Sequence, residues 1–404
     1  MGNTPNIRFK GFTDYWEQRK LIDYLEVSSE KNRDNRFTKD DVLSVSGEYG
    51  IVNQIEFQGR SFAGASVSNY GVVENGDVVY TKSPLKSNPY GIIKTNKGIP
   101  GIVSTLYAVY KPKEITDSKF VQIYFELDSR MNSYMHPLVN KGAKNDMKVS
   151  AENALKGMVS FPSIREQEMI AAYFENIDNL ITLHQRKCDE TKKLKKFMLQ
   201  KMFPKKDAKK PEIRFAGFTD DWEQRKLNEV AEFNPKSELP DEFEYVDLES
   251  VVGTEMISHR TETKDSAPSR AQRLAQPGDV FFQTVRPYQK NNYLFSKLDN
   301  NYVFSTGYAQ MRPNIDTAFL MSFLQTDSFV KIVLDNCTGT SYPAINSSDL
   351  SNLEISLPKS FEEQKKVGKT IISIDNLITL HQRKCDELKE FKKYMLQNMF
   401  PQKG

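Results

Sequence analysis

Apolar residues recur every three or four positions in two segments of the chain, which is the spacing of one buried helix face. The pattern is sustained for about four heptads in each segment, and a stripe of that length is typical of a coiled-coil seam. The predicted seam comprises Ile177, Ile181, His184 and Cys188 in the first segment and Ile374, Ile378, His381 and Cys385 in the second.

A capping box precedes each stripe and a proline follows it. The S-x-x-E pattern begins helices, and proline cannot continue one. The residues are Ser163, Glu166 and Pro204 in the first segment and Ser360, Glu363 and Pro401 in the second. We therefore predict long helices over residues 163–203 and 359–404. About 40 residues at ~1.5 Å per residue would make each helix about 60 Å long.

The other two segments, 1–162 and 212–358, show a different pattern. Short apolar runs such as GDVVY and GDVFFQTV are punctuated by Gly, Pro and Asn, which favours short strands. SKFVQIYFELDSRMNSYM and TAFLMSFLQTDSFVKIVL have helical periodicity and predict amphipathic helices. Each of these bodies is therefore expected to be a mixed α+β domain, with the order of its strands left open.

An internal repeat relates the two halves of the chain. IRFKGFTDYWEQRKL, from Ile7, matches IRFAGFTDDWEQRKL, from Ile213, at 13 of 15 positions. IDNLITLHQRKCDE occurs unchanged at Ile177 and at Ile374. The bodies match only weakly, and the first unit carries nine extra residues between Leu21 and Gly142. The lysine-rich residues 204–211 separate the two units as a linker. Each unit is thus a variable body followed by a fixed helical segment.

Composition restricts the possible classes of protein only slightly. A chain of 404 residues exceeds one ordinary core, in agreement with two domains. We expect no membrane span, because ~18 apolar residues never run together, and no signal peptide. The three widely spaced cysteines favour reduced thiols and a cytoplasmic location. The net charge is only +3, so a nucleic-acid surface would depend on local clustering of Lys and Arg.

The order and spacing of these motifs resemble the specificity subunit of a bacterial type I restriction–modification enzyme. The resemblance covers essentially the whole chain. It rests on the GFTDxWEQRKL openings, SRAQRLAQPGDVFFQTVRP, LPKSFEEQKKV and the paired IDNLITLHQRK helices. It implies that each body is a target recognition domain reading half of a bipartite site in double-stranded DNA. It also implies that the helices form an antiparallel coiled coil holding the two readers a fixed distance apart.

The same resemblance implies the partners. Two methyltransferase subunits would bind the helices, and restriction (translocase) subunits would join them. The chain itself would be non-catalytic and bind no cofactor, since S-adenosylmethionine, ATP and Mg²⁺ are expected on the partner subunits. The repeat pattern fits this division of labour. Bodies that meet different bases can diverge, whereas surfaces that meet each other or the same partner twice cannot change alone.

Loop residues that interrupt the matched sequence are the candidates for DNA contact, because Arg can read guanine and Gln can read adenine through paired hydrogen bonds. In the first body they are Lys82, Ser83, Lys86, Lys141, Lys144, Asn145 and Lys148. In the second body they are Gln283, Arg286, Tyr288, Lys290, Thr340, Ser341 and Tyr342. Candidates for phosphate contact or loop bracing are Arg60, Arg270 and Arg273.

Other signals are weaker. His184, Cys188, His381 and Cys385 are zinc-ligand types, but structural zinc normally uses shorter cysteine spacings, so packing is favoured and no metal is expected. Asp241 with ETK at 262–264 imitates a nuclease motif in one unit only. KKLKKF and KEFKKY could touch phosphate, but they fit the solvated face of a coiled coil. The alternative functions are a single-chain methyltransferase or nuclease and a coiled-coil scaffold that binds no DNA.

Overall fold

The computed structural model describes residues 4–82, 88–139, 149–299, 301–339 and 341–401. Its contacts divide the chain into two compact units, of which unit 1 comprises Met1–Thr182 with Cys385–Gly404 and unit 2 comprises Leu183–Lys384. The division runs across both long helices. Each unit therefore contains one body, the start of the helix that follows that body, and the end of the other helix.

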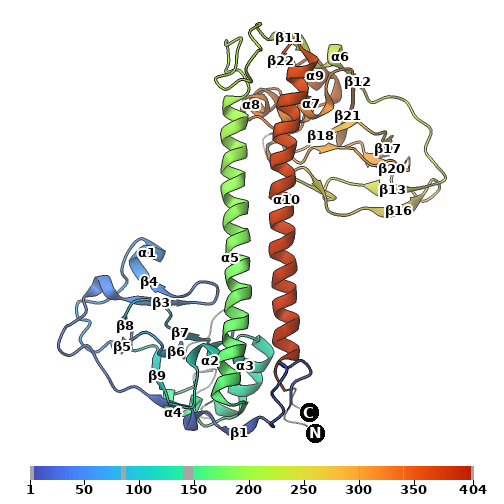
Figure 1. The fold of residues 1–404 in the computed structure, drawn as a ribbon. Coiled ribbons are helices and arrows are strands. Elements are labelled where there is room, and N and C mark those ends of the chain that lie inside the picture. Colours follow the sequence, from blue (N-terminus) through green and yellow to red (C-terminus); the bar gives the residue numbers. More distant parts are fainter. Residues whose placement is uncertain (1–3, 83–87, 140–148, 300, 340, 402–404) are drawn as a thin grey trace. The chain divides into compact units, whose positions relative to one another are not determined.

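The two long helices are α5 (Ile164–Lys201) and α10 (Phe361–Asn398), each of 38 residues (Figure 1). Inside each unit, the residue numbers of the contacting positions on α10 decrease as those on α5 increase, which confirms antiparallel packing there. The contacts in unit 2 are His184–His381, Cys188–Ile378 and Lys195–Asp375; those in unit 1 are Asp178–Lys392 and Ile181–Cys385.

The predicted capping boxes are wrong in their second half. The Ser360 hydroxyl accepts a hydrogen bond from the Glu363 amide at 3.4 Å, as expected. The carboxylate of Glu363, however, pairs with Arg214 at 2.7 Å. Glu166 pairs with Arg8 in the same way, also at 2.7 Å. Both glutamates are only 1% exposed, and a carboxylate buried to that degree needs a charged partner.

Both bodies are α+β, and they share one four-stranded sheet and one strand pair. Unit 1 has a four-stranded sheet in the order β2-β9-β6-β7, and unit 2 has the matching sheet β12-β21-β18-β19. In both units an antiparallel pair, β1-β10 or β11-β22, joins the start of the body to the strand before the long helix. The remaining strands differ: unit 1 forms the pairs β3-β4 and β5-β8, whereas unit 2 forms the sheet β16-β13-β20-β17 and the pair β14-β15.

The strands of unit 1 are β1 (Glu17–Lys20), β2 (Leu25–Val27), β3 (Leu43–Ser46), β4 (Gly50–Asn53), β5 (Gly71–Val73), β6 (Val78–Tyr80), β7 (Ile93–Thr95), β8 (Gly101–Val103), β9 (Ala108–Pro112) and β10 (Met158–Phe161). Its helices, besides α5, are η1 (Leu21–Asp23), η2 (Lys39–Asp41), α1 (Gln54–Gln58), α2 (Ser118–Tyr124), α3 (Asp128–Met135), η3 (His136–Leu138) and α4 (Ala151–Ala154).

The strands of unit 2 are β11 (Glu223–Lys226), β12 (Ala231–Phe233), β13 (Glu242–Val246), β14 (Val251–Val252), β15 (Glu255–Met256), β16 (Arg260–Thr263), β17 (Ala271–Leu274), β18 (Val280–Gln283), β19 (Tyr293–Leu294), β20 (Tyr302–Ser305), β21 (Tyr308–Pro313) and β22 (Glu354–Leu357). Its helices, besides α10, are α6 (Leu227–Val230), η4 (Pro287–Gln289), α7 (Thr317–Leu324), α8 (Asp327–Asp335) and α9 (Ser347–Ser351).

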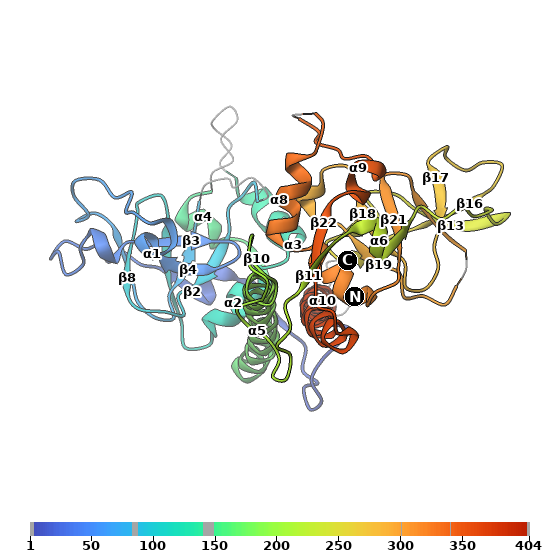
Figure 2. The same cartoon turned by 90° about the horizontal axis from the view of Figure 1, so that it is seen from above.

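Each stretch with the predicted amphipathic pattern is two helices, α2 with α3 and α7 with α8. The axes of α7 and α8 meet at 66°. The break has a local cause in unit 2, where the Thr326 hydroxyl accepts a hydrogen bond from the Phe329 amide at 3.3 Å and begins a new helix. These helices lie beside the long helices, whereas β3 and β4 in unit 1 and β13 and β16 in unit 2 lie farther away (Figures 1 and 2).

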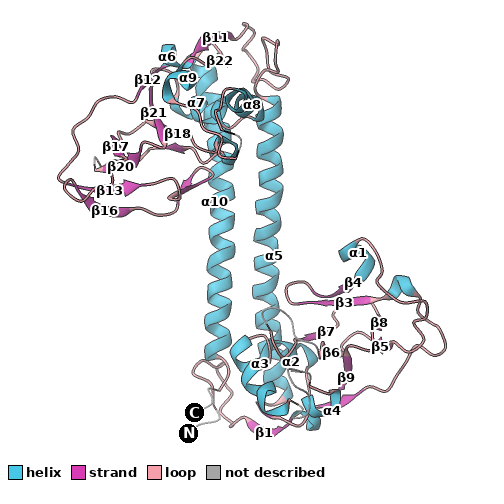
Figure 3. Ribbon diagram, turned by 180° about the vertical axis from the view of Figure 1, so that it is seen from behind, coloured by secondary structure: helices cyan, strands magenta, loops and turns pink. Residues whose placement is uncertain are grey.

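The core of each body is completed by the end of the long helix from the other repeat. Met399 and Phe400, after α10, join the unit 1 cluster that contains Trp16. Met202 and Phe203, after α5, join the unit 2 cluster that contains Trp222. Figure 3 shows the helices of each body gathered near the long-helix segments of that unit.

Candidate nucleic-acid interface

Several predicted contact residues lie outside the described residues: Ser83, Lys86, Lys141, Lys144, Asn145, Lys148 and Thr340. The DNA contacts proposed for these residues therefore remain predictions from the sequence. The described candidates are Lys82, Gln283, Arg286, Tyr288, Lys290, Ser341 and Tyr342, together with Arg60, Arg270 and Arg273.

In unit 2 the structure brings two predicted loops together. Val285 and Ala344 form an isolated antiparallel bridge, and the Arg286 amide donates to the Pro343 carbonyl at 2.8 Å. The Arg286 guanidinium lies 4.5 Å from the centre of the Tyr342 ring, a cation–π contact. The loop after β18 and the loop before α9 are therefore one surface, although more than fifty residues separate them in sequence.

This surface presents groups suited to nucleic acid. Tyr342 is 62% exposed and Tyr288 is 50% exposed, and Ser341 is also exposed. Arg286 has a positive φ of 54°, an uncommon backbone conformation for a residue other than glycine. Strained residues of this kind persist where surrounding contacts hold them, and they cluster at functional sites. We call Arg286, Tyr288, Ser341 and Tyr342 the reading surface.

Gln283 is not part of the reading surface. It is only 3% exposed, and its side-chain amide donates to the Val285 carbonyl at 2.7 Å and to Gln289 Oε1 at 3.0 Å. The prediction that Gln283 reaches a base is wrong for this conformation, because β18 directs its side chain into the domain. Gln283 instead braces the loop that carries Arg286.

Lys290 closes the same loop, with φ of 56°. Its ammonium donates to the Gln325 carbonyl at 2.9 Å and pairs with Asp327. The Gln325 side chain donates in return to the Lys290 carbonyl at 3.2 Å. These contacts fix the loop against the junction of α7 and α8.

In unit 1 the described counterpart of this loop is Lys82, which follows β6 as Arg286 follows β18. Lys82 also has a positive φ, of 50°. Its ammonium donates to the Thr105 carbonyl at 2.8 Å, and burial, followed by the charge of Lys31, lowers the pKa of Lys82. Arg60 is exposed and lies 4.6 Å from the Phe62 ring. Both bodies therefore place a basic residue in a left-handed conformation after the equivalent strand.

The other two predicted arginines flank the second sheet of unit 2. Arg270 is exposed, and its carbonyl accepts a hydrogen bond from the Thr306 amide at 2.8 Å. Arg273, on β17, is half-buried, and its buried Nε has no hydrogen-bond partner among the described residues. Burial lowers the pKa of Arg273.

The predicted seam residues face the paired helix within each unit. Ile177, Cys188, Ile374 and Cys385 are buried, and Ile181, His184, Ile378 and His381 are half-buried. His184 Nδ1 and His381 Nδ1 are 3.1 Å apart, which fits one shared N–H. Cys188 Sγ lies 3.7 Å from Gln382 Oε1. Among the described residues, no group of three or more His, Cys, Asp or Glu side chains is arranged to hold a metal ion.

The repeat also duplicates charged contacts that sequence reasoning missed. Lys392 pairs with Asp178 in unit 1, and Lys195, at the matching position, pairs with Asp375 in unit 2, both at 2.6 Å. Burial raises the pKa of Asp375, although Lys195 opposes the shift. The sequence does contain a signal for these contacts, because the lysine and the aspartate each recur at the fixed offset of the repeat. Their partners could not be assigned before the helices were known to be antiparallel.

A second duplicated feature is apolar and exposed. Four hydrophobic residues at matching positions of each long helix are between 44% and 58% exposed. They are Leu180, Leu183, Leu194 and Phe197 on α5, and Leu377, Leu380, Phe391 and Tyr394 at the matching positions of α10. At ~100° per residue, the four on each helix fall within about 100° of its circumference. We call each set an apolar stripe.

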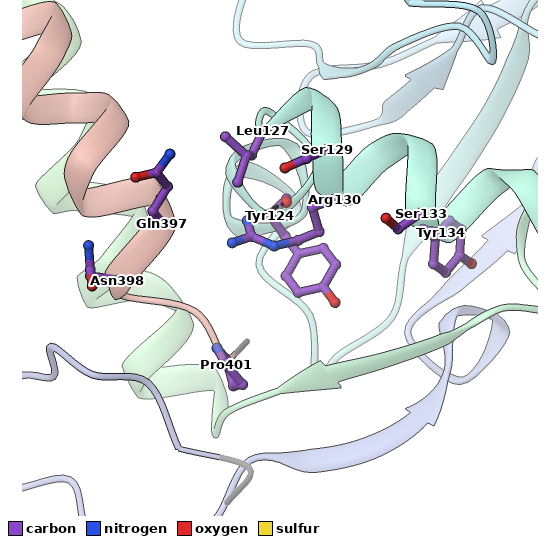
Figure 4. A pocket seen from close by; sticks show the side chains of 9 residues that line it. All are labelled: Tyr124, Leu127, Ser129, Arg130, Ser133, Tyr134, Gln397, Asn398 and Pro401. Atoms are coloured by element: carbon purple, nitrogen blue, oxygen red, sulfur yellow. Dashed lines mark hydrogen bonds between the residues drawn. The ribbon is translucent and has the colours of Figure 1, made fainter. Parts of the chain in front are cut away.

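A cavity of about 500 Å³ in unit 1 lies between α3 and the end of α10 (Figure 4). Its most polar side chain, Arg130, donates to the Tyr124 carbonyl at 2.9 Å and to the Leu396 carbonyl at 2.8 Å. The guanidinium also lies 4.4 Å from the Phe400 ring. Burial lowers the pKa of Arg130 to about 10. Arg130 therefore caps the last turn of α10, and the cavity belongs to the junction between helix and body.

Within the described ranges, no single helix is long and apolar enough to cross a membrane, and α7 and α8 reach the required length and hydropathy only together, across their bend.

Comparison with known proteins identifies relatives of this architecture. Residues 219–390 match the family described as type I restriction modification DNA specificity domain. The type I restriction enzyme MjaVIII specificity subunit of Methanocaldococcus jannaschii is 25% identical over 331 residues, covering 77% of this chain and 75% of that protein. A second protein of that organism, provisionally named the MjaX specificity subunit, is 22% identical over 418 residues, covering 94% and 92%.

A solved structure supports the fold. The S subunit of a type I restriction–modification system from M. genitalium superposes with a TM-score of 0.63 and 13% identity, covering 99% of this chain and 100% of that one.

Proposed function

We propose that this chain is a type I restriction–modification specificity subunit that reads a bipartite site in double-stranded DNA, because residues 219–390 match the DNA specificity domain and two specificity subunits are similar to most of the chain. Each recognition domain reads one half of the site, and the helices set the separation between the halves. The observation that carries this proposal is the uneven divergence of the repeat. The loops after β6 and β18 differ, whereas fourteen residues of the long helices are identical.

For the second half-site, the reading surface supplies the contacts. A guanidinium such as that of Arg286 offers paired donors to guanine in the major groove. The cation–π contact with Tyr342 holds that guanidinium in place, which lowers the entropy lost on binding. Tyr288 and Tyr342 offer aromatic faces and hydroxyls beside it. Lys82 marks the equivalent position for the first half-site.

The apolar stripes are the proposed docking sites for two methyltransferase subunits. Exposed apolar patches on a folded protein mark interaction sites, and the same stripe occurs on both helices at matched positions. One partner type binding twice would account for a surface that is conserved between the copies. Restriction (translocase) subunits join this core. The chain itself has no catalytic role, and S-adenosylmethionine, ATP and Mg²⁺ act on the partner subunits.

The test begins with the recognised sequence. Mapping modified bases across the host genome, with and without this gene, should reveal two specified half-sites and a constant gap. Replacing residues 82–148 with the matching segment of a relative should then change one half-site only. A change in both halves would contradict modular reading.

A second experiment addresses the spacing. Inserting one heptad into α10 should lengthen the gap and leave both half-sites intact. An unchanged gap in an active complex argues against the helices as the spacing element.

The rival functions have direct tests. Incubating the purified chain with DNA, Mg²⁺ and S-adenosylmethionine should produce neither cleavage nor methylation; either product would favour the single-chain enzyme. A chain that binds no duplex, alone or with its methyltransferase partners, would favour the scaffold.

A further inference from the structure

A groove of about 310 Å³ in unit 2 runs between α5 and the loop that carries the reading surface. Four of its lining residues are lysines. The groove is lined by Lys192, Lys195, Lys196, Leu199 and Gln200 of α5 and by Lys290, Gln325 and Asp327 of the body. A concave surface with this composition attracts anions, because low-dielectric walls concentrate the field of the charges that line it.

The positive charge of the groove is only partly compensated. Lys195 pairs with Asp375, and Lys290 pairs with Asp327. Lys192 and Lys196 are exposed and enter no ion pair among the residues that the structure describes. Four lysines therefore face two carboxylates.

The equivalent place in unit 1 has a smaller excess of positive charge among the described residues. Lys389 and Lys393 match Lys192 and Lys196, and Lys392 matches Lys195. Glu126 stands where unit 2 has Gln325, and it pairs with Lys392 at 2.6 Å. The other two carboxylates there are Asp178, which also pairs with Lys392, and Asp128, which accepts a hydrogen bond from Asn88. Burial lowers the pKa of Lys94, and the charges of Glu126, Lys392 and Asp178 also act on it, so Lys94 belongs to the same cluster. Among the described residues four lysines thus face three carboxylates, and the excess of positive charge is larger in unit 2.

The groove is continuous with the reading surface. Arg286 and Lys290 stand at the two ends of η4, and four steps of 3₁₀ helix span only ~8 Å. Phosphates of one DNA strand follow each other every ~3.4 Å along the duplex axis. A strand that meets Arg286 would therefore bring a phosphate to Lys290 within about two or three nucleotides.

We propose that this groove binds backbone phosphates of the DNA strand that the second recognition domain reads, with Lys192 and Lys196 as the cationic contacts. The inference rests on the proposed DNA-reading function and adds an asymmetric phosphate clamp to it. Lys290 links the clamp to the reading surface, since its loop is fixed to Gln325. Phosphate contacts position a protein on the duplex, whereas base contacts select the sequence.

The clamp is separate from the docking surface. At ~100° per residue, Lys192 and Lys196 lie about half a turn of α5 from the apolar stripe formed by Leu180, Leu183, Leu194 and Phe197. A methyltransferase subunit on the stripe would leave the groove accessible to DNA.

The experiment compares two matched double variants of the full chain. Lys192→Gln with Lys196→Gln removes the clamp, and Lys389→Gln with Lys393→Gln removes the same two charges from the counterpart in unit 1. Binding to a labelled duplex is measured by fluorescence anisotropy across a NaCl series. Each lost phosphate contact reduces the slope of log K against log salt by ~0.9, so the first variant should lose about 1.8. The second should keep the wild-type slope.

The outcomes separate the clamp from the function on which it rests. Failure of the wild-type chain and its complex to bind duplex would overturn both. Wild-type binding with an unchanged slope in the Lys192→Gln/Lys196→Gln variant would overturn the clamp alone, as would equal losses in the two variants. Inorganic phosphate is a separate arm. If phosphate raises the melting temperature of the wild type but not of the clamp variant while the DNA slope is unchanged, the groove binds a free anion instead.

Discussion

The two recognition domains meet the helices through the same contacts but differ in the strands beyond them. In both units a buried glutamine, Gln167 or Gln364, fixes the amide that begins α2 or α7 at 3.0–3.1 Å. In both units a phenylalanine after the long helix completes the core. The outer strands, in contrast, pair two by two in unit 1 and form a four-stranded sheet in unit 2. Packing against a helix preserves the junction, and under the proposed function the outer strands diverge because they would read different DNA.

The largest expected effect comes from breaking the junction itself. Phe400→Ala should lower the free energy of unfolding of unit 1 by about 3–5 kcal/mol, and Phe203→Ala should do the same to unit 2, because each ring is buried and leaves a cavity. Urea unfolding followed by tryptophan fluorescence separates the units, since Trp16 and Trp222 lie in different ones. In a Trp222→Phe background, Phe400→Ala should shift the transition and Phe203→Ala should not. Equal shifts would show that the junctions do not act independently.

The duplicated ion pairs should have the next largest effect. Lys195→Met leaves Asp375, whose side chain is 11% exposed, without its partner, and removing one partner of a buried pair costs about 3 kcal/mol. Burial already raises the pKa of Asp375, and loss of Lys195 removes the opposing effect. The ionised form of Asp375 then destabilises the folded state. The loss in the free energy of unfolding should therefore be full at about pH 7 and should shrink as pH falls through the raised pKa.

The control for this prediction removes both charges. Lys195→Met with Asp375→Leu should recover most of the stability and lose the pH dependence in chemical denaturation. Lys392→Met should lower the free energy of unfolding by less for each carboxylate that loses its partner, because Asp178 is 38% exposed and solvent screens its charge. A pH-independent loss in the Lys195→Met variant would contradict this account.

Specificity should divide between the domains. Arg286→Ala should weaken discrimination at one base pair of one half-site by about 1–3 kcal/mol, because a paired contact with a base edge contributes that much. Lys82→Ala should affect only the other half-site, and Lys393→Ala should barely alter either. Competition between duplexes that differ at single positions of the mapped site measures this. If Arg286→Ala weakened binding to every sequence equally, its contact would be with phosphate.

The smallest effect concerns the histidine pair in unit 2. Desolvation, and then His381, Lys187 and Lys384, lower the pKa of His184. The unfolded chain therefore binds more protons below about pH 6.5, and stability should fall as pH falls through that range. His381→Gln should flatten this slope in urea unfolding at a series of pH values, and Lys384→Gln, which keeps both imidazoles and removes a weaker cause, should flatten it less. A slope unchanged by His381→Gln would remove the pair as its cause.

The long helices and the two variable bodies could be predicted from the sequence because their signals are local, whereas the antiparallel pairing of the helices was implied by the family resemblance. A 3.6-residue period over 38 residues, a capping serine and a following proline act through backbone geometry and need no distant contact. The repeat added the second helix at a known offset. The same reasoning reached the positions after β6 and β18, where polar residues interrupt matched strands.

Only the tertiary structure decided which candidates share a surface. Gln283 and Arg286 are three residues apart, yet strand register buries the first and a left-handed turn places the second, half-buried, against Tyr342. Glu166 and Glu363 matched a local capping rule, but burial made them partners of Arg8 and Arg214. The sequence by itself determined the elements and their duplication, because these follow from neighbours along the chain. Burial and charge pairing depend on residues far apart in sequence, so they became defined only when the chain was folded.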